Sequence, residues 1–421
     1  MRQLKQYVLP VILLLVLFSP LIGAIPDFSK YYHYDEFERM ILELRSYENV
    51  RVEAIGKSWM NRTIYAIFIG NVYEKPVVLI VGGHHGREHV SAQFPLYYAY
   101  LLVTNESQRK LLDHYSFIII PLLNPDGYEE AFKNPWHRKN CRPLDDDGDG
   151  LLDEDPPQDT DGDGYIAFFT NGSSYWFEGF DDDKDGKLNE DWIGGVDLNR
   201  NYPVAWDKGD INKFSLQYKG PAPLSEPETK ALDSLVKRYR FCIVLAISYH
   251  SGARLVLYPW SHTREKPPRE KVFREVCTAY SNVTKYPVLQ SSRLYLSFGE
   301  FMDYMLYEYN ITSITVEIFG RFMDIKWHRE HTYRVDSTIV FKHVYEYFNP
   351  YPREELKKVL KINAIALKSM LLYYTKYLPA RSPGITKETV RRIVLVNIVF
   401  LAIALAVIIS DYKRYTHRLF K

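Results

Sequence analysis

The sequence contains little cysteine and almost no net charge. Cys141, Cys242 and Cys277 are the only cysteines among 421 residues, so at most one disulfide can form and stability does not rest on a disulfide framework. The 53 lysines and arginines balance 52 aspartates and glutamates, which leaves a formal net charge of +1. A chain so balanced gives no reason to expect nucleic acid as a partner. It contains no long repeat, and a hydrophobic content of 46% suffices for one large core.

Long apolar runs occur near both ends of the chain. Residues 1–24 have a basic start, an apolar centre and small residues at the end, which predicts a secretory signal peptide. Residues 393–409 are apolar except for Asn397 and have basic flanks, so residues 386–412 are predicted to form a single transmembrane anchor. Residues 413–421 then form a short basic cytoplasmic tail, and residues 25–385 lie outside the cell. Sequons compatible with surface glycosylation begin at Asn61, Asn105, Asn171, Asn282 and Asn310.

Short apolar runs alternate with helical patterns along residues 25–385. The runs that predict strands are 50–55, 64–69, 77–81, 117–121, 241–247 and 314–318. Residues 29–50 and the apolar segment after residue 90 have helical spacing instead. This alternation predicts an α/β fold with a mixed, largely parallel central sheet and helices on both faces. Residues 350–385 are predicted to form extra helices or a stalk.

Charged side chains follow the strand predicted at residues 77–81, at the edge where open α/β sheets place their active sites. His85 and Glu88, three apart, offer a nitrogen and a carboxylate oxygen to a metal such as zinc. In a competing interpretation, HxxEH, both His85 and His89 bind zinc and Glu88 is the base. That interpretation needs a regular helix over residues 85–89, whereas the glycines at 82, 83 and 86 favour a loop.

Residues 145–191 form the most acidic part of the chain and are predicted to be a calcium-binding insert. A DxDxDG pattern starts at Asp145, Asp159 and Asp181, and it resembles the beginning of an EF-hand loop. Residues other than glutamate stand at the twelfth loop position, so these are not true EF-hands; the alternative is a disordered acidic loop. The candidate calcium ligands are Asp145, Asp147, Asp149, Asp153, Asp159, Asp161, Asp163, Asp181, Asp183 and Asp185.

Further polar residues lie at or near the ends of predicted strands. They are Arg138 in PWHRKN, Asn199 and Arg200 in GVDLNRNY, His250 in SYHSGARLVLYP, Tyr295 in YLSFGEFMDY and Glu317 in SITVEIF. Each has a structural alternative, since a lone histidine after a strand is often a core residue and a lone glutamate a surface carboxylate. Together with HxxE and in this order, however, they resemble the zinc metallocarboxypeptidases of the carboxypeptidase A and T type.

The resemblance implies a role for each residue. His85, Glu88 and His250 match the zinc ligands, and Glu317 matches the general base. Arg138 matches the arginine that polarises the scissile carbonyl. The residues implied in substrate binding are Asn199 and Arg200 at the terminal carboxylate, Tyr295 closing over the substrate, Arg87, and Met302 and Ser261 beside the terminal side chain. Neither Met302 nor Ser261 is charged, which argues against a basic-residue preference and for an apolar or mixed one.

The sequence therefore predicts residues 25–385 to be a zinc carboxypeptidase domain that acts on peptide or protein C-termini at the outer face of the membrane. One catalytic Zn²⁺ and structural Ca²⁺ are the expected cofactors. The alternatives are a zinc amidohydrolase or cell-wall peptidase on the same scaffold, and a catalytically inactive calcium-dependent binding ectodomain. Asn199, Arg200 and Tyr295 together favour a carboxypeptidase, because the resemblance implies that these residues recognise a free α-carboxylate.

Overall fold

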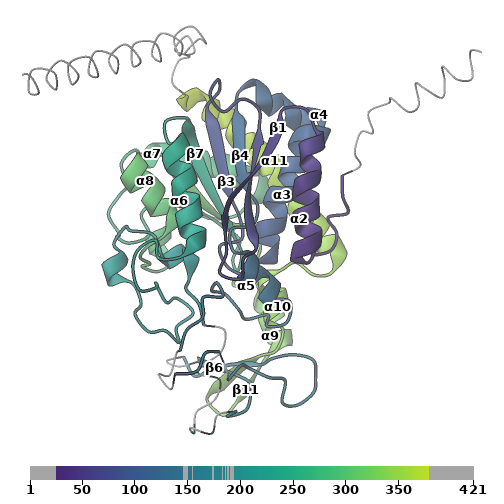
Figure 1. The fold of residues 1–421 in the computed structure, drawn as a ribbon, viewed down its shortest axis with the longest axis vertical. Coiled ribbons are helices and arrows are strands. Elements are labelled where there is room, and N and C mark those ends of the chain that lie inside the picture. The colour runs from purple at the N-terminus through teal and green to yellow at the C-terminus, as the bar shows by residue number, and fades with distance from the viewer. Residues whose placement is uncertain are drawn as a thin grey trace, which may run out of the picture. The chain divides into compact units, whose positions relative to one another are not determined.

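A computed structural model describes residues 25–378 except 146–149, 154, 173–174, 183, 185, 187–188 and 190–193 (Figure 1). The signal peptide predicted at 1–24, the anchor predicted at 386–412 and the tail at 413–421 lie outside the described residues. Among the residues that are described, no helix is both long and apolar enough to cross a membrane.

The centre of the fold is an eight-stranded mixed sheet in the order β1-β2-β4-β3-β7-β10-β8-β9. The inner strands β4, β3, β7 and β10 are parallel to one another. On one side of them β1 pairs antiparallel with β2 and β2 with β4, and on the other side β8 pairs antiparallel with β10. This arrangement confirms the predicted mixed α/β fold. The strands are β1 (Val50–Lys57), β2 (Thr63–Ile69), β3 (Val77–Val81), β4 (Ser116–Ile120), β7 (Ile243–His250), β8 (Leu255–Tyr258), β9 (Val288–Gln290) and β10 (Thr312–Glu317).

Helices cover both faces of this sheet (Figure 1). Every residue of β3 is fully buried, as expected for a strand whose two faces are both covered. Val77, Leu79 and Val81 pack in one core cluster with residues of α6 and α8, and the alternate residues point to the opposite face. The longer helices are α2 (Tyr34–Glu43), α3 (His89–Thr104), α6 (Pro227–Tyr239), α7 (Glu270–Thr284), α8 (Phe301–Tyr309) and α11 (Arg353–Tyr374). Shorter ones are α4 (Glu106–Arg109), α5 (Pro125–Glu130), α9 (Ile325–His331) and α10 (Val344–Phe348).

Helix α11 occupies most of the segment predicted as extra helices or a stalk. The Tyr280 hydroxyl in α7 donates to Asn363 Oδ1 in α11 over 2.7 Å, and the Tyr115 hydroxyl donates to the carbonyl of Leu371 over 2.9 Å. Leu367 is fully buried in the same helix. Through residue 374 the segment is thus part of the packed domain, and residues 379–385 lie outside the described residues.

A second, four-stranded antiparallel sheet joins the acidic insert to a later part of the chain. Its order is β11-β12-β5-β6, with Phe168 of β5 opposite Phe341 of β12. Figure 1 shows β6 and β11 at the end of the domain away from α3 and α4. The sequence did not predict these strands, β5 (Phe168–Thr170), β6 (Tyr175–Phe177), β11 (Thr332–Val335) and β12 (Thr338–Phe341).

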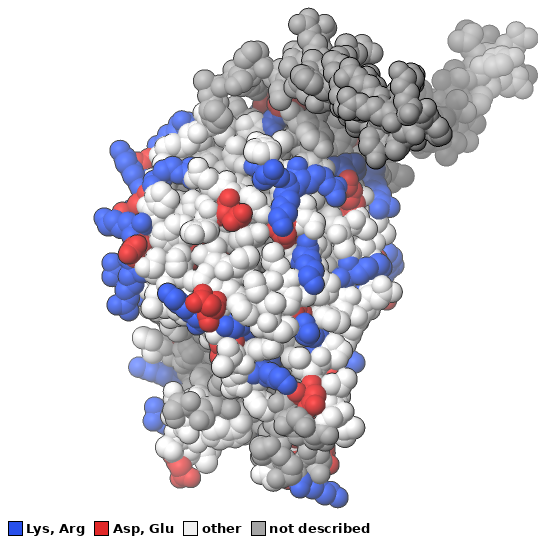
Figure 2. Space-filling model, turned by 60° about the vertical axis from the view of Figure 1, so that its left-hand side comes forward, with Lys and Arg blue, Asp and Glu red and all other residues white. Residues whose placement is uncertain are grey.

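The surface carries charges of both signs. Figure 2 shows lysine and arginine side chains interspersed with aspartate and glutamate on the face that it displays. The sequon asparagines Asn61, Asn105, Asn171, Asn282 and Asn310 are all exposed. The three cysteines are free, so none of them contributes a disulfide.

Candidate active site

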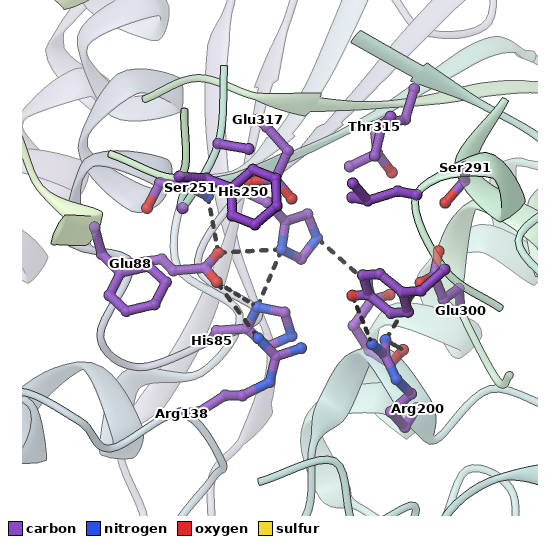
Figure 3. A pocket seen from close by; sticks show the side chains of 18 of the residues that line it. His85, Glu88, Arg138, Arg200, His250, Ser251, Ser291, Glu300, Thr315 and Glu317 are labelled. Carbon is purple, nitrogen blue, oxygen red and sulfur yellow. Dashed lines mark hydrogen bonds and ion pairs between the residues drawn. The ribbon is translucent and has the colours of Figure 1, made fainter. Parts of the chain in front are cut away.

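Three donor side chains converge at the carboxyl edge of the central sheet. His85 lies in the loop after β3, Glu88 directly precedes α3, and His250 is the last residue of β7. Donor atoms of all three lie within 4.8 Å of one another. Glu88 Oε1 is 2.8 Å from His85 Nδ1, and Glu88 Oε2 is 3.2 Å from His250 Nδ1 (Figure 3). Both imidazoles therefore turn the same ring nitrogen toward one buried point.

The loop that carries His85 needs glycine at position 86. A Cβ atom there would lie 2.2 Å from the carbonyl oxygen of Gly127, closer than any side chain tolerates. Helix α3 begins only at His89, so residues 85–88 are not helical. The two ring nitrogens of His89 lie 2.8 Å from the Tyr345 hydroxyl and 2.8 Å from the Tyr128 carbonyl. His89 is therefore not part of the donor cluster, which consists of His85, Glu88 and His250, and the HxxEH interpretation is wrong.

Asp197 connects the donor residue His85 to Arg138. Its Oδ1 lies 3.0 Å from His85 Nε2, and its Oδ2 accepts a hydrogen bond from Arg138 Nε over 2.9 Å. Burial acts to raise the pKa of Asp197, but Arg138 and His85 outweigh it and hold that pKa well below its ordinary value. A carboxylate on the outer nitrogen of a histidine fixes the ring's tautomer and orientation. Asp197 was not among the residues predicted from the sequence, although it stands in the same DLNR segment as Asn199 and Arg200.

Glu317 ends β10 next to this cluster. The parallel register of β10 and β7 pairs Glu317 directly with His250. Its Oε2 atom is buried and has no hydrogen-bond partner among the described residues. Burial, with a further contribution from the nearby Glu88 carboxylate, raises the pKa of Glu317 to about 8.

These residues fit a zinc ion. Two imidazole nitrogens and one carboxylate are the donor set of catalytic zinc sites, in which a further position stays open. Glu88 and Glu317 also bring two carboxylates into one largely buried site, where their repulsion is strong unless a cation offsets it. The unpartnered oxygen of Glu317 is suited to a water molecule beside such an ion.

Arg138, Arg200 and Tyr295 share a cavity of about 290 Å³ with the cluster. Arg138 Nη1 lies 3.7 Å from Glu88 Oε1, and only 12% of the Arg138 side chain is exposed. Arg200 Nη2 donates to the Tyr295 hydroxyl over 3.2 Å, and Asn199 Oδ1 accepts from the backbone amide of Phe301. Figure 3 shows Arg200 on the opposite side of His250 from Glu88. Tyr295 is half exposed, as a side chain that covers the mouth of a cavity would be.

The structure differs from the sequence-based expectation at the other proposed substrate contacts. Met302 is buried in α8 and is not among the residues that line the cavity, and Ser261 lies behind Glu300, to which its hydroxyl donates. Glu300 lines the cavity instead, because the backbone is extended at residue 300 and α8 begins only after it. Arg87 is also absent from this cavity. Its guanidinium packs over the Phe348 ring at 4.2 Å and lines a neighbouring apolar cavity.

The described part of the acidic insert contains three similar turns. The first aspartate of each pattern accepts a backbone hydrogen bond from the glycine five residues later, at Asp145–Gly150 (3.2 Å), Asp159–Gly164 (2.8 Å) and Asp181–Gly186 (3.1 Å). Asp159 and Asp161 also come together with buried Glu178, which was not among the predicted calcium ligands. Asp163 and Asp161 both pair with Lys342, and Asp153 accepts from the amide of Gly194. Calcium binding stays a prediction, and Asp147, Asp149, Asp183 and Asp185 lie outside the described residues.

Residues 39–326 match the sequence model of the peptidase M14 family, described as zinc carboxypeptidase. This match covers well over half of the chain. The chain belongs to the zinc carboxypeptidase family. Family membership agrees with the His85–Glu88–His250 cluster, which has the donors that a zinc carboxypeptidase requires.

The individual relatives of this family member are distant in sequence. It is 26% identical over 267 residues to mast cell carboxypeptidase A of Rattus norvegicus, covering 59% of this chain and 54% of that protein. Carboxypeptidase B of Astacus astacus is 25% identical over 249 residues, covering 57% and 68%. The chain thus spans about half the length of the first of these relatives.

Solved structures share the fold. Bovine thrombin-activatable fibrinolysis inhibitor, determined in complex with tick carboxypeptidase inhibitor, has a TM-score of 0.59 at 21% identity and covers 83% of this chain and 99% of that one. Carboxypeptidase A from Helicoverpa armigera has a TM-score of 0.61 at 20% identity, covering 83% and 75%.

Proposed function

We propose that this family member is a zinc-dependent carboxypeptidase that hydrolyses the last peptide bond of peptides or proteins. One observation carries the proposal. A single cavity holds the unpartnered oxygen of Glu317 beside the donor cluster on one side and Arg200 with Tyr295 on the other. The first group can activate water, and the second can hold a carboxylate.

The residues of the cavity divide the reaction between them. Zinc, when bound, polarises the peptide carbonyl and lowers the pKa of water toward ~7. Glu317, whose ionised form would be favoured by the positive charge of a bound zinc ion, accepts a proton from the attacking water at Oε2 and passes it to the leaving amine. Arg138, held by Asp197, donates to the oxyanion that develops on the scissile carbonyl, a type of contact worth on the order of 3 kcal/mol.

Recognition of the chain end falls to Arg200 and Asn199. A guanidinium offers two parallel N–H groups that match a carboxylate, and only the last residue of a peptide carries such a group on its backbone. Arg200 is almost fully buried, so the pair it forms with a substrate is shielded from water. Tyr295 is half exposed, its hydroxyl already accepts a hydrogen bond from Arg200, and its side chain can close over the bound residue.

We further propose that the catalytic domain faces the outside of a membrane. The support is the sequence, with a signal-like segment at 1–24 and an apolar stretch flanked by basic residues within 386–412. Exposure of all the sequon asparagines in the domain is compatible with that side. Protease treatment of intact cells tests it: the domain should be digested and a tag on residues 413–421 protected, and a protected domain would contradict the proposal.

The activity is tested with matched peptides that end in a free carboxylate or in an amide. Full-length protein in detergent, loaded with zinc, should release the last residue only from the free acids, as followed by mass spectrometry. Equal cleavage of both sets would favour the amidohydrolase or cell-wall peptidase alternative. A protein that binds no zinc and cleaves neither set would favour the inactive binding ectodomain.

A further inference from the structure

One buried carboxylate in the cavity has no part in the mechanism described above. Glu300 is only 7% exposed and lines the cavity together with Arg200. Gly299 has a φ of +71°, and a Cβ atom there would lie 2.1 Å from the carbonyl oxygen of Arg200. This close approach of two backbones fixes Glu300 against the residue that is proposed to hold the substrate's carboxylate.

Glu300 has three polar partners, of which one is charged. Arg200 Nη1 lies 3.3 Å from Glu300 Oε1. The Ser261 hydroxyl donates to Oε2 over 2.6 Å, and the Ser297 hydroxyl donates to Oε1. In the free protein, Arg200 is therefore the cation that balances the Glu300 carboxylate.

Substrate binding changes this balance. The α-carboxylate of a substrate takes the positive charge of Arg200, so Arg200 then faces two carboxylates and Glu300 loses its full compensation. A buried charge without compensation is unfavourable by several kcal/mol in general. A cation on the substrate can restore neutrality. The terminal side chain belongs to the same residue as the α-carboxylate on Arg200, so it is the substrate group that can reach Glu300 beside Arg200.

The walls of the cavity suit a long basic side chain. Leu257 and Leu294 provide apolar surface for a methylene stem, and Ser291 and Thr315 add small polar groups. Figure 3 shows Ser291, Thr315 and Glu300 on the same side of His250. Lysine and arginine bury their stems along apolar walls while the charged group finds a polar partner.

We propose that Glu300 is the residue that selects substrates ending in lysine or arginine. The inference rests on the proposed carboxypeptidase function, and it replaces the expectation of an apolar or mixed preference drawn from Met302 and Ser261. That expectation placed Met302 beside the terminal side chain, but Met302 does not line the cavity. Glu300, and not Met302, lines the cavity, so a carboxylate stands where the terminal side chain is proposed to bind.

A different role for Glu300 makes a distinguishable prediction. If Glu300 only positioned Arg200, its loss would weaken binding of every free carboxylate to the same extent. If it selects basic side chains, its loss changes the ratio between substrates, because specificity is a difference between two affinities.

The experiment compares kcat/KM of the zinc-loaded full-length protein for peptides that differ only in a C-terminal Lys, Arg, Phe or Leu. We expect the basic pair to exceed the apolar pair at least about 30-fold, which corresponds to about 2 kcal/mol. Glu300→Gln, which keeps the side chain's size, should bring the ratio close to one. The control Glu308→Gln removes a charge from an exposed position in α8, the helix that follows Glu300, and should leave the ratio unchanged.

A second measurement needs no variant. Peptides ending in lysine and in Nε-acetyllysine are similar in shape and differ in charge, and wild-type protein should prefer lysine at least about 30-fold. Equal rates for these two peptides, or an unchanged ratio in Glu300→Gln, would overturn the role of Glu300. Release of no C-terminal residue from any peptide would instead overturn the carboxypeptidase proposal, and the two failures are thus distinguishable.

Discussion

Glu317 and His250 are register partners on the adjacent parallel strands β10 and β7. Each is the last residue of its strand, so the backbone ladder of the sheet places a carboxylate beside a metal-ligand candidate. Strand ends in a buried sheet are rigid, and residues mounted on such elements are held more accurately than residues on loops. The pairing of β10 with β7 thereby brings the proposed proton acceptor, Glu317, next to the donor cluster.

Glu317→Gln tests the proton acceptor. The amide cannot accept the proton of the attacking water, so we expect kcat to fall about 10²–10⁴-fold. Zinc content, measured by atomic absorption, should stay at one ion per chain, because Glu317 is not among the donor residues. A variant that retains a tenth or more of wild-type kcat would contradict the role of Glu317.

Asp197→Asn tests the link between His85 and Arg138. The amide is neutral and cannot accept at both former oxygen positions, so His85 loses its fixed orientation. We expect zinc affinity to fall about 10–100-fold, as measured by competition with a chelator of known affinity. Asp207→Asn, at an exposed position, is the matched control and should bind zinc like the wild type. Unchanged affinity in Asp197→Asn would show that the bridge does not support the ligand.

Glu228 should make stability depend on pH. Burial, with a further contribution from the Glu226 carboxylate, raises the pKa of Glu228 to about 8. Between about pH 4.5 and 8 the folded state keeps a proton that the unfolded state has lost. The free energy of unfolding therefore falls as pH rises through this window. Below the window Glu228 is protonated in both states, and its contribution to the free energy of unfolding is fully present.

Glu228→Gln removes that dependence because the amide does not ionise. Between about pH 5 and 8 the free energy of unfolding of the wild type should fall relative to that of the variant by a few kcal/mol, as measured by urea unfolding at several pH values. Glu106→Gln, whose side chain is 90% exposed, should follow the wild type throughout. Parallel pH profiles for Glu228→Gln and the wild type would refute the assignment.

Leu367 tests whether α11 is an integral part of the domain. Its side chain is fully buried, and Leu367→Ala should lower the free energy of unfolding by about 2–5 kcal/mol. Leu372 is 45% exposed in the same helix, and Leu372→Ala should change stability by about 0.5 kcal/mol or less. Chemical denaturation of both variants distinguishes a packed helix from a detached stalk. In a detached stalk, both substitutions would lower the free energy of unfolding by equally small amounts.

Calcium should stabilise the insert if its aspartate turns bind the ion. Addition of Ca²⁺ to chelator-treated protein at 100 times Kd would add about 2.7 kcal/mol to folding and raise Tm. Asp159→Asn should reduce the increase, because Asp159 stands with Asp161 and Glu178 at one point. Mg²⁺ at equal ionic strength is the control. An identical Tm with either ion would argue that Lys342 alone balances these aspartates.

The main elements of the fold and the donor residues His85 and Glu88 followed from local pattern. Strand β3 is an uninterrupted apolar run with glycines directly after it, and His85 and Glu88 stand three residues apart just beyond. Such signals lie within a few neighbouring residues, so a single sequence displays them. His250 and Glu317 also stand at or near the ends of apolar runs, but their expected roles came from the resemblance to the zinc metallocarboxypeptidases and not from local pattern.

By itself the sequence determined the α/β architecture and which residues form the donor cluster. Only the tertiary structure decided how Asp197 bridges His85 and Arg138, why Glu300 and not Met302 lines the cavity, and how β5 of the insert pairs with β12. The reason is separation along the chain. His85 and Asp197 are 112 residues apart and Arg200 and Glu300 are 100 apart, and contacts at such distances arise from packing, which leaves no periodicity or spacing in the sequence.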